Sequence, residues 1–202
     1  LMMEAGYKAL GLDNWKYLTL EVPPENLKEA ISSLRTFNMK GIHLTIPHKV
    51  SVLEYLDEIS STAKTMGAVN TVMNIDGKLV GENTDGKGFM ESLKKDAKVN
   101  PAGKNIVILG AGGAARAICV ELAFANVDSI TIINRSTKRG EELAQLLFES
   151  SNVTVDFLPW DNLLSLPSDV DILVQATSIG LYPNKEKPSI NYDSLKPGIL
   201  AC

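Results

Sequence analysis

The stretch Ile106-Val107-Ile108-Leu109-Gly110-Ala111-Gly112-Gly113-Ala114-Ala115 decides the fold, because an apolar strand runs into a glycine turn that opens a helix. The turn fits the pattern G-x-G-x-x-G/A, with Ala115 at its last position. In this pattern Gly110 permits a tight turn, Gly112 lets backbone N–H groups approach a pyrophosphate, and Ala115 lets the helix pack closely on the strand. The N-terminus of the helix favours anions. The stretch therefore predicts a βαβ unit that binds a dinucleotide.

Strands and helices alternate on both sides of this stretch, which predicts an α/β fold with largely parallel sheets. Downstream, the pattern predicts strand 105–109, helix 114–126, strand 129–133, helix 137–150, strand 153–158, a short helix near residue 163, strand 171–176 and the start of a strand at 198–200. This half of the chain is expected to form a Rossmann-type domain with a parallel sheet.

Upstream, the pattern predicts helix 2–10, strand 17–22, helix 25–36, strand 41–46, helix 50–59, a short helix before Met66-Gly67, a hairpin of strands 68–75 and 78–82, and a helix that follows 83–86 and ends near 95. Asp76-Gly77 is the strongest short hairpin signal. Residues 96–104 are polar and read as a linker. We therefore expect two α/β domains, residues 1–96 and residues 97–202.

The composition is that of an ordinary globular protein. Of the 202 residues, 45% are apolar and 22% are charged, which is ordinary for a soluble domain. The net charge of −4 and the absence of a Lys/Arg block argue against nucleic acid as a partner. Residues 106–125, the longest apolar run, contain Arg116 and Glu121, so they read as strand, turn and helix rather than as a membrane span.

The cysteines and histidines predict no metal site. Cys119 lies in an apolar helical stretch and reads as a buried thiol, and Cys202 is far from it in sequence. His43 and His48 lack further ligands at metal-binding spacing. Reduced cysteines and the lack of a signal peptide indicate the cytoplasm.

The end of the strand after the glycine turn distinguishes the two nicotinamide cofactors. An NAD enzyme usually carries Asp or Glu there to bind the ribose 2′-OH. This chain has Asn134, followed by Arg135, Ser136 and Arg139. A neutral amide does not repel a 2′-phosphate, and two guanidinium groups can clamp it. The residues favour NADP; the alternative is that both arginines are solvated at the start of a helix.

Three segments of the first half place polar side chains where a strand ends, namely residues 45–49, 67–71 and 83–86. Such turns line the ligand crevice of α/β sheets. Taken singly, each has an ordinary explanation: Lys49 as a surface lysine, Asn70 as a sheet-end cap, and Asp85 as a helix N-cap. Together they form a candidate polyol site with one lysine and one aspartate.

At these residues the chain resembles the shikimate dehydrogenase family, including its quinate/shikimate relatives. Six segments carry the resemblance, in the family's order: Gly41-Ile42-His43-Leu44-Thr45-Ile46-Pro47-His48-Lys49, Gly67-Ala68-Val69-Asn70-Thr71, Asn83-Thr84-Asp85-Gly86-Lys87-Gly88-Phe89, Gly110 to Ala115, Asn134-Arg135-Ser136 with Arg139, and Ala176-Thr177-Ser178-Ile179-Gly180-Leu181. Together they cover nearly the whole chain.

The resemblance implies NADP-dependent interconversion of 3-dehydroshikimate and shikimate, a step of aromatic amino-acid and chorismate biosynthesis. It makes residues 1–96 a substrate-binding catalytic domain and residues 97–202 an NADP-binding domain. It implies Lys49 and Asp85 as the catalytic pair, and Thr45, Asn70, Asp85 and His43 as substrate-binding residues. The candidate cofactor-binding residues are Gly110, Ala111, Gly112, Gly113, Ala114, Asn134, Arg135, Ser136, Arg139, Thr177, Ser178 and Gly180.

The chemistry fits these residue types. An alkoxide develops on the ketone oxygen as hydride arrives, and the Lys49 ammonium can stabilise that charge and donate the proton. Asp85 can hydrogen-bond both Lys49 and a ring hydroxyl. Ring hydroxyls left unpaired in a dry site are costly, which calls for several neutral polar groups around them.

The chain departs from the family pattern at three places. His43 stands where the family has Asn, which raises quinate or another ring acid as a substrate, and Leu181 replaces Met. The family's upstream Ser-x-Ser segment and its downstream Tyr, Gln and return segment are not found, so we expect truncation at both ends. Two alternatives remain open: a quinate/shikimate dehydrogenase with relaxed NAD(P) use, and a non-catalytic NADP-binding module. A monomer or a homodimer is expected.

Overall fold

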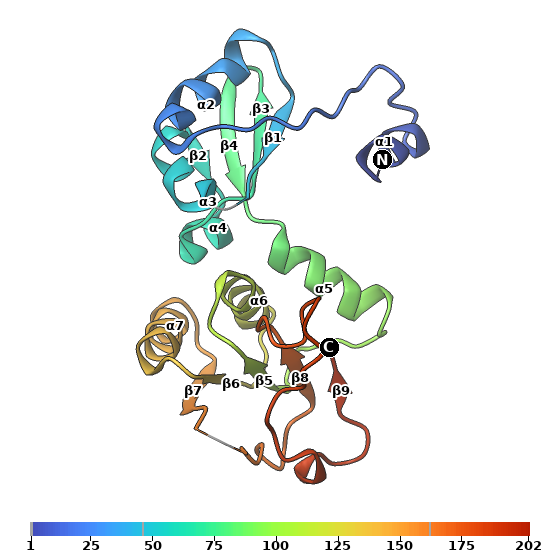
Figure 1. The fold of residues 1–202 in the computed structure, drawn as a ribbon, viewed down its shortest axis with the longest axis vertical. Helices are drawn as coiled ribbons and strands as arrows, with labels where there is room; N and C mark the ends of the chain where they lie inside the picture. The colour runs from blue at the N-terminus through green and yellow to red at the C-terminus, as the bar shows by residue number, and fades with distance from the viewer. Residues whose placement is uncertain (1, 46, 162) are drawn as a thin grey trace.

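The computed structural model describes residues 2–45, 47–161 and 163–202, and it contains two sheets that α5 (Asp85–Lys95) connects (Figure 1). The first sheet has the order β1-β3-β4-β2, and the second has the order β7-β6-β5-β8-β9. The predicted α/β fold with a Rossmann-type parallel sheet is confirmed.

The first sheet is built from β1 (Gly41–His43), β2 (Glu58–Ile59), β3 (Thr71–Ile75) and β4 (Lys78–Glu82). Its helical elements are α1 (Met2–Ala9), η1 (Pro24–Asn26), α2 (Leu27–Thr36), α3 (His48–Ser51), η2 (Val52–Tyr55) and α4 (Ser61–Met66). The predicted hairpin joins β3 to β4, and Asp76 and Gly77 both have positive φ angles, 51° and 87°. These angles match the type I′ turn that Asp-Gly favours.

The first sheet is mixed, so the expectation of largely parallel sheets is wrong for it. β3 pairs antiparallel with both β1 and β4, and only β2 runs parallel to β4. A two-residue turn can join only antiparallel strands, which explains the direction of the β3–β4 pair.

The expected helix over residues 50–59 is wrong beyond Tyr55. The backbone N–H groups of Asp57 and Ser60 donate to the carbonyls of Leu79 and Gly81, at 3.0 Å each. Sheet pairing with β4 therefore takes the donors that a continued helix would have used, and Glu58–Ile59 becomes β2.

Two other expected elements are also wrong. Residues 17–22 form no strand, because they make no ladder with any described residue, and the side chains of Leu18 and Leu20 are 67% and 56% exposed. Near residue 163 there is no helix in the described part; Leu164 instead forms an isolated parallel bridge with Ile190. The expected strand 41–46 ends at His43, with Ile46 outside the described residues.

The second sheet is parallel throughout. It consists of β5 (Asn105–Leu109), β6 (Ser129–Asn134), β7 (Thr154–Pro159), β8 (Ile172–Gln175) and β9 (Leu200–Ala201), with α6 (Gly113–Phe124), α7 (Thr137–Ser150) and η3 (Tyr192–Ser194). Numbered from β5 along the chain, its order is that of a dinucleotide-binding sheet, and the order reverses between β5 and β8. Ligands of such sheets bind at this switch point.

Both faces of the second sheet are buried. Ile106 and Ile108 lie in the core cluster that contains α6, and Val107 and Leu109 lie in a separate cluster with Trp160. Alternate residues of a strand point to opposite faces, so the continuous apolar run of β5 fits a strand covered on both sides.

Helix α5 connects the two sheets and packs against the helix α6 of the second. It follows β4 of the first sheet, yet Leu93 lies in the core cluster of α6. Near its start, Gly86 faces the backbone carbonyl of Ala117 in α6 so closely that a Cβ at Gly86 would overlap it. Such an approach between two helices requires a residue without a side chain.

We expect Gly86→Ala to lower the free energy of unfolding by about 1–3 kcal/mol, because α5 must move away from the Ala117 carbonyl. Gly88→Ala is the matched control, since a Cβ there meets nothing within 4 Å. The control should gain up to about 1 kcal/mol from helix propensity. Urea unfolding of both variants measures the difference; equal effects would show that the helices do not depend on Gly86.

Candidate functional site

The proposed catalytic pair forms in the structure. The Nζ atom of Lys49, in α3, donates to Oδ2 of Asp85, the first residue of α5, at 2.8 Å. The side chains are 28% and 41% exposed, so the pair is open to solvent and to a ligand. Two residues 36 positions apart in sequence thus meet just beyond the end of β4.

Asp85 does not act as a helix cap. Thr84 occupies the N-cap position of α5, without a side-chain cap bond. Both oxygens of Asp85 are instead engaged, Oδ2 with Lys49 and Oδ1 with the Nδ2 group of Asn70 at 2.7 Å. The interpretation of Asp85 as the N-cap of this helix is therefore wrong, and its carboxylate is held by side chains from two other segments.

Asn70 organises the neighbouring hydroxyl groups. Its side chain is 8% exposed, and Nδ2 donates to Asp85 and to Oγ1 of Thr84. Its Oδ1 accepts from the Thr71 hydroxyl at 3.0 Å, from the Thr84 hydroxyl at 3.2 Å and from the Thr84 backbone N–H at 2.9 Å. Every hydrogen-bonding position of the amide is used, which fixes its orientation.

Asn83 holds the loop that carries Asp85. It is 2% exposed, its Nδ2 donates to the Ala68 carbonyl, and its Oδ1 accepts from the Asp85 backbone N–H at 3.1 Å. The segments 67–71 and 83–86 are thereby tied to each other. The expectation that residues 67–71 follow a strand is wrong, because they lead from α4 into β3; since β3 runs antiparallel to β4, its first residue lies beside the end of β4.

The remaining substrate-binding candidates, Thr45 and His43, flank Leu44, whose backbone N–H donates to the Asn70 backbone carbonyl. Thr45 is exposed on the loop between β1 and α3, and its carbonyl accepts from the His48 N–H. His43 pairs with Thr71 across β1 and β3, and its Nδ1 lies 3.1 Å from the Thr71 hydroxyl. Thr71 therefore connects His43 to Asn70.

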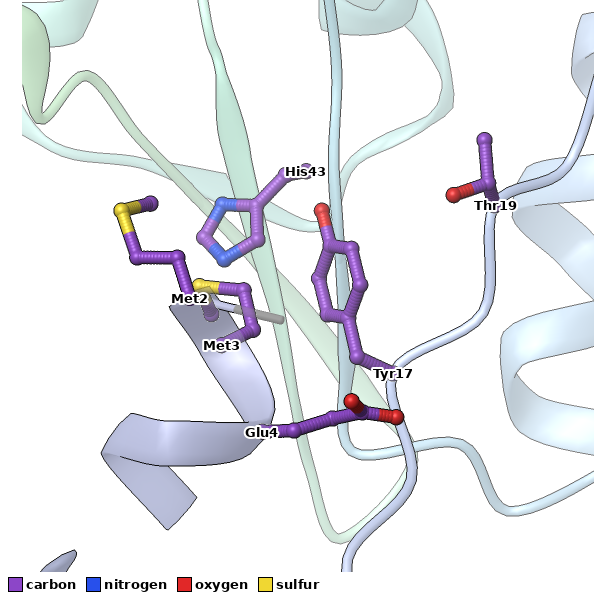
Figure 2. Close-up of a pocket in the computed structure, with 6 residues that line it drawn as sticks. All are labelled: Met2, Met3, Glu4, Tyr17, Thr19 and His43. Atoms are coloured by element: carbon purple, nitrogen blue, oxygen red, sulfur yellow. The ribbon is translucent and has the colours of Figure 1, made fainter.

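A pocket of about 570 Å³ opens beside His43 and is lined by Met2, Met3, Glu4, Tyr17, Thr19 and His43. Figure 2 shows the imidazole of His43 between the two methionines of α1 and the phenol of Tyr17. The ring centroids of Tyr17 and His43 are 6.1 Å apart. Sequence reasoning missed Tyr17, Thr19 and the methionines, because nothing in their local pattern placed them beside His43.

The glycine turn has the geometry that a phosphate cradle needs. Gly110 has a φ of 115°, which favours glycine, and its N–H donates to the Ile133 carbonyl at 2.8 Å. A Cβ at Gly112 or Gly113 would meet nothing within 4 Å, so the start of α6 faces open space. Ala115 is fully buried, as close packing of helix on strand predicts. These residues fit the pyrophosphate of a dinucleotide.

The loop after β8 lies against the glycine turn. A Cβ at Gly110 would come within 2.9 Å of the Ala176 carbonyl and 3.1 Å of Thr177 Cγ2. Thr177 uses its hydroxyl within the loop, donating to Gln175 and accepting from the Ile179 N–H. Of the candidates here, Thr177 is thus occupied in shaping the loop, while Ser178 and Gly180 are exposed.

The end of β6 presents positive charge. Asn134 ends the strand, and its Nδ2 donates to the Ser136 carbonyl. Ser136 caps α7 by accepting from the Arg139 N–H at 3.5 Å. Arg135 and Arg139 are exposed and form no ion pair with any described residue.

Two absences concern only the part of the chain that the structure describes. None of its helices has the length and apolar character needed to cross a membrane. No group of three or more His, Cys, Asp or Glu residues gathers there in an arrangement that could hold a metal ion.

Comparison with known proteins gives the family. The model of the shikimate dehydrogenase substrate-binding domain matches residues 1–72, and that of shikimate / quinate 5-dehydrogenase matches residues 92–186. A shikimate dehydrogenase (NADP(+)) of Desulforamulus reducens is 43% identical, over 100% of this chain and 70% of the relative. The chain belongs to the shikimate dehydrogenase family. The resemblance stated from the six segments is confirmed.

Solved structures show the same fold. The ligand-free 5-ketofructose reductase of Gluconobacter sp. strain CHM43 has a TM-score of 0.94 and 44% identity, over 99% of this chain and 71% of that one. Shikimate 5-dehydrogenase of Listeria monocytogenes, in complex with shikimate and NAD, has a TM-score of 0.90 and 32% identity, over 99% and 71%. The chain thus spans about 70% of the length of these relatives.

A cluster of charged side chains lies between α4, α5 and α6, next to the candidate site. Glu82 accepts from Lys87 at 2.8 Å, from Ser60 at 2.7 Å and from the Asn83 N–H. Burial alone would raise the pKa of Glu82, but these three hydrogen bonds outweigh it and lower the pKa below the ordinary 4.5.

Glu121 of α6 lies beside the same cluster, and its carboxylate has fewer hydrogen-bond partners than that of Glu82. Its Oε1 is buried without a hydrogen-bond partner among the described residues. Burial raises the pKa of Glu121, and the Lys87 ammonium and a hydrogen bond from Thr62 offset only part of this shift, while the charge of Glu82 adds to it.

Because the folded-state pKa of Glu121 is raised, the folded chain binds more protons here than the unfolded chain, and stability falls as pH rises through that interval. We expect Glu121→Gln to be more stable than the parent at pH 7, with a smaller difference below pH about 4.5, where both states are protonated. Urea midpoints over this range measure the effect. An equal difference at all pH values would contradict a role for the charge.

Proposed function

We propose that this chain carries out NADP-dependent, reversible reduction of 3-dehydroshikimate to shikimate, a reaction of chorismate and aromatic amino-acid biosynthesis. The Lys49–Asp85 pair carries the proposal, because it sets an ammonium group beside a polar cluster suited to hydroxyl groups. The named activity of the Desulforamulus reducens relative supports the substrate and the cofactor.

NADPH supplies a hydride when it is bound. Gly110, Ala111, Gly112, Gly113 and Ala114 would hold its pyrophosphate; Asn134, Arg135, Ser136 and Arg139 would hold its 2′-phosphate; and Thr177, Ser178 and Gly180 would lie near the nicotinamide. The open space over Gly112 and Gly113 and the exposed arginines support this assignment.

Lys49 would act on the ketone oxygen. As negative charge develops there, the ammonium stabilises it and donates a proton from Nζ. Asp85 keeps that ammonium in place through its Oδ2, and it accepts from a ring hydroxyl in the ligand complex. Asn70 orients Asp85, and Thr45 would contact a further hydroxyl, which keeps the polar groups of the ligand paired.

A second candidate is reduction of a keto sugar. The Gluconobacter structure supports it, since that protein is named a 5-ketofructose reductase and is 44% identical to this chain. A quinate/shikimate dehydrogenase with relaxed NAD(P) use is a third reading, which the Listeria monocytogenes complex with shikimate and NAD supports. A non-catalytic NADP-binding module is disfavoured by the formed Lys49–Asp85 pair.

We further propose a substrate unit of residues 1–96 and a cofactor unit of residues 97–202, in the cytoplasm, as a monomer or a homodimer. The two separate sheets support the division, and the free thiols of Cys119 and Cys202 support a reducing compartment.

We expect Lys49→Ala to lower kcat by about 10²–10⁴, because the proton donor is lost. NADPH binding, measured by fluorescence titration, should be unchanged. Lys78→Ala is the control, since Lys78 forms an exposed ion pair with Glu58. NADPH oxidation with 3-dehydroshikimate is the assay, and full turnover by Lys49→Ala would refute the role of Lys49.

We expect the double variant Arg135→Ala/Arg139→Ala to raise the KM for NADPH by about 10–100-fold, through the loss of two charge-assisted contacts. The KM for NADH should stay within about three-fold, because NADH lacks the 2′-phosphate. Lys138→Ala removes a charge from the same helix turn but from a lysine that faces Glu142, so it serves as control. Equal losses with both cofactors would place the arginines outside the phosphate site.

A further inference from the structure

Glu82 is a charged residue of the first sheet that the proposed chemistry does not use. It is the last residue of β4, and its side chain is 17% exposed. Its Oε1 atom accepts two hydrogen bonds, from the Ser60 hydroxyl at 2.7 Å and from the Asn83 backbone N–H at 2.9 Å. Its Oε2 atom accepts from the Lys87 ammonium at 2.8 Å. Hydrogen bonds to an ionised carboxylate are among the stronger ones in proteins, so these three donors fix its position.

The partners of Glu82 stand on both sides of Asp85 in the chain. Asn83 comes before Asp85, and Lys87 comes after it. Glu82 holds the backbone of Asn83, and the Asn83 side chain accepts from the Asp85 backbone N–H at 3.1 Å. Both ends of the segment that carries the Asp85 carboxylate are therefore hydrogen-bonded to one side chain, that of Glu82.

The Ser60 contact connects the same segment to α4. Ser60 is the N-cap residue of α4, and its hydroxyl donates to Glu82. On another side, Gly86 lies against the backbone of α6. The first turn of α5 is thus in contact with α6 through Gly86 and connected to α4 through Glu82, and Asp85 is the first residue of this turn.

The two oxygens of Glu82 contribute differently to this arrangement. Lys87 is 46% exposed, and an ion pair with an exposed partner contributes little, because water competes for the ammonium. The hydrogen bonds from Ser60 and Asn83 to Oε1 are part-buried, and a buried donor that loses its acceptor is costly. The position of the loop therefore depends more on Oε1 than on the ion pair.

We infer that Glu82 is a positioning residue for the reaction: through Oε1 it holds the loop that keeps the Asp85 carboxylate between Lys49 and Asn70. The inference rests on the proposed function, in which Asp85 keeps the Lys49 ammonium in place for the ketone oxygen. Glu82 acts through the backbone of Asn83 and touches no ligand in this scheme.

Turnover of 3-dehydroshikimate with NADPH is the first readout, with kcat calculated per NADPH-binding molecule so that unfolded protein does not count. We expect Glu82→Ala to lower kcat by about 10–100-fold, the cost of displacing a catalytic group by about 1 Å, and to leave the Kd for NADPH within about three-fold. Glu82→Gln keeps an acceptor oxygen for Ser60 and Asn83, so its kcat should stay within about three-fold of wild type.

Glu58→Ala is the matched control, because it removes an exposed glutamate that pairs with Lys78 on the same sheet. Its kcat should stay within about two-fold of wild type, as exposed ion pairs contribute little. Full turnover by Glu82→Ala would overturn the inference, and so would a Glu82→Gln variant as slow as Glu82→Ala.

A double-mutant cycle tests whether Glu82 acts through Asp85. In an Asp85→Asn background, Glu82→Ala should lower kcat by no more than about three-fold further, because the carboxylate whose position it controls is already gone. Two losses that multiply would show that Glu82 affects catalysis by another route, which contradicts the inference.

A third readout needs no turnover. The Asn70 side-chain NH₂ donates to Asp85 Oδ1, so its nitrogen–proton resonance reports where that carboxylate lies. In the nitrogen-labelled full chain, with the resonance assigned by its loss in Asn70→Ala, we expect Glu82→Ala to shift it toward its position in Asp85→Ala. Glu82→Gln should leave it unchanged. An unshifted resonance in Glu82→Ala would show that Glu82 does not hold the carboxylate.

The readouts separate the two proposals. If the wild-type chain oxidises no NADPH with 3-dehydroshikimate, the proposed function fails, and the Asn70 resonance still decides whether Glu82 holds the Asp85 carboxylate. If wild-type turnover is normal and Glu82→Ala is as active, with an unshifted resonance, the proposed function stands and the positioning role fails.

Discussion

The close contact of α5 with α6 is the constraint on which the site depends. Gly86 lies against the Ala117 carbonyl of α6, and Asp85 precedes Gly86 in the chain. The same α6 begins at the glycine turn, with Gly113 as its first residue. The carboxylate beside Lys49 and the phosphate cradle are thus positioned by two helices that touch where α5 has no room for a side chain.

The carboxylate of Asp85 and the backbone N–H of Thr84 together set the orientation of the Asn70 amide. Because a carboxylate cannot donate, the Asn70 group beside it is the amide NH₂, and the Thr84 backbone N–H donates to the carbonyl at the other end of the amide. Hydrogen bonds through Thr71 connect this amide to His43, so the network extends from the first turn of α5 to the edge strand β1. An apolar residue at position 85 would remove the ion pair with Lys49 and one acceptor of the amide, whereas the Thr84 backbone N–H would still hold the amide carbonyl.

Local chemistry made the second sheet and the hairpin predictable from sequence. The apolar run Ile106–Leu109 before Gly110 predicts a buried strand followed by a tight turn, and Asp76-Gly77 predicts a hairpin turn. The structure contains both. Long-range pairing was the part that local patterns could not supply. Residues 17–22 alternate like a strand but form no ladder with any described residue. Residues Glu58–Ile59 were expected in a helix but form β2, because the neighbouring N–H groups of Asp57 and Ser60 donate to carbonyl groups of β4.

The same distinction explains what was found and missed in the site. Lys49, Asn70 and Asp85 could be named because each belongs to a recognisable segment, and the structure brings them together at the end of the first sheet where β1 and β4 end and β3 begins. The Tyr17 ring and the Met2 and Met3 side chains come from an extended segment and a helix with no such mark, so only the fold sets them beside His43. The fold likewise places His43 beside the Thr71 hydroxyl and the Tyr17 ring, two neighbours that its own segment of sequence does not predict.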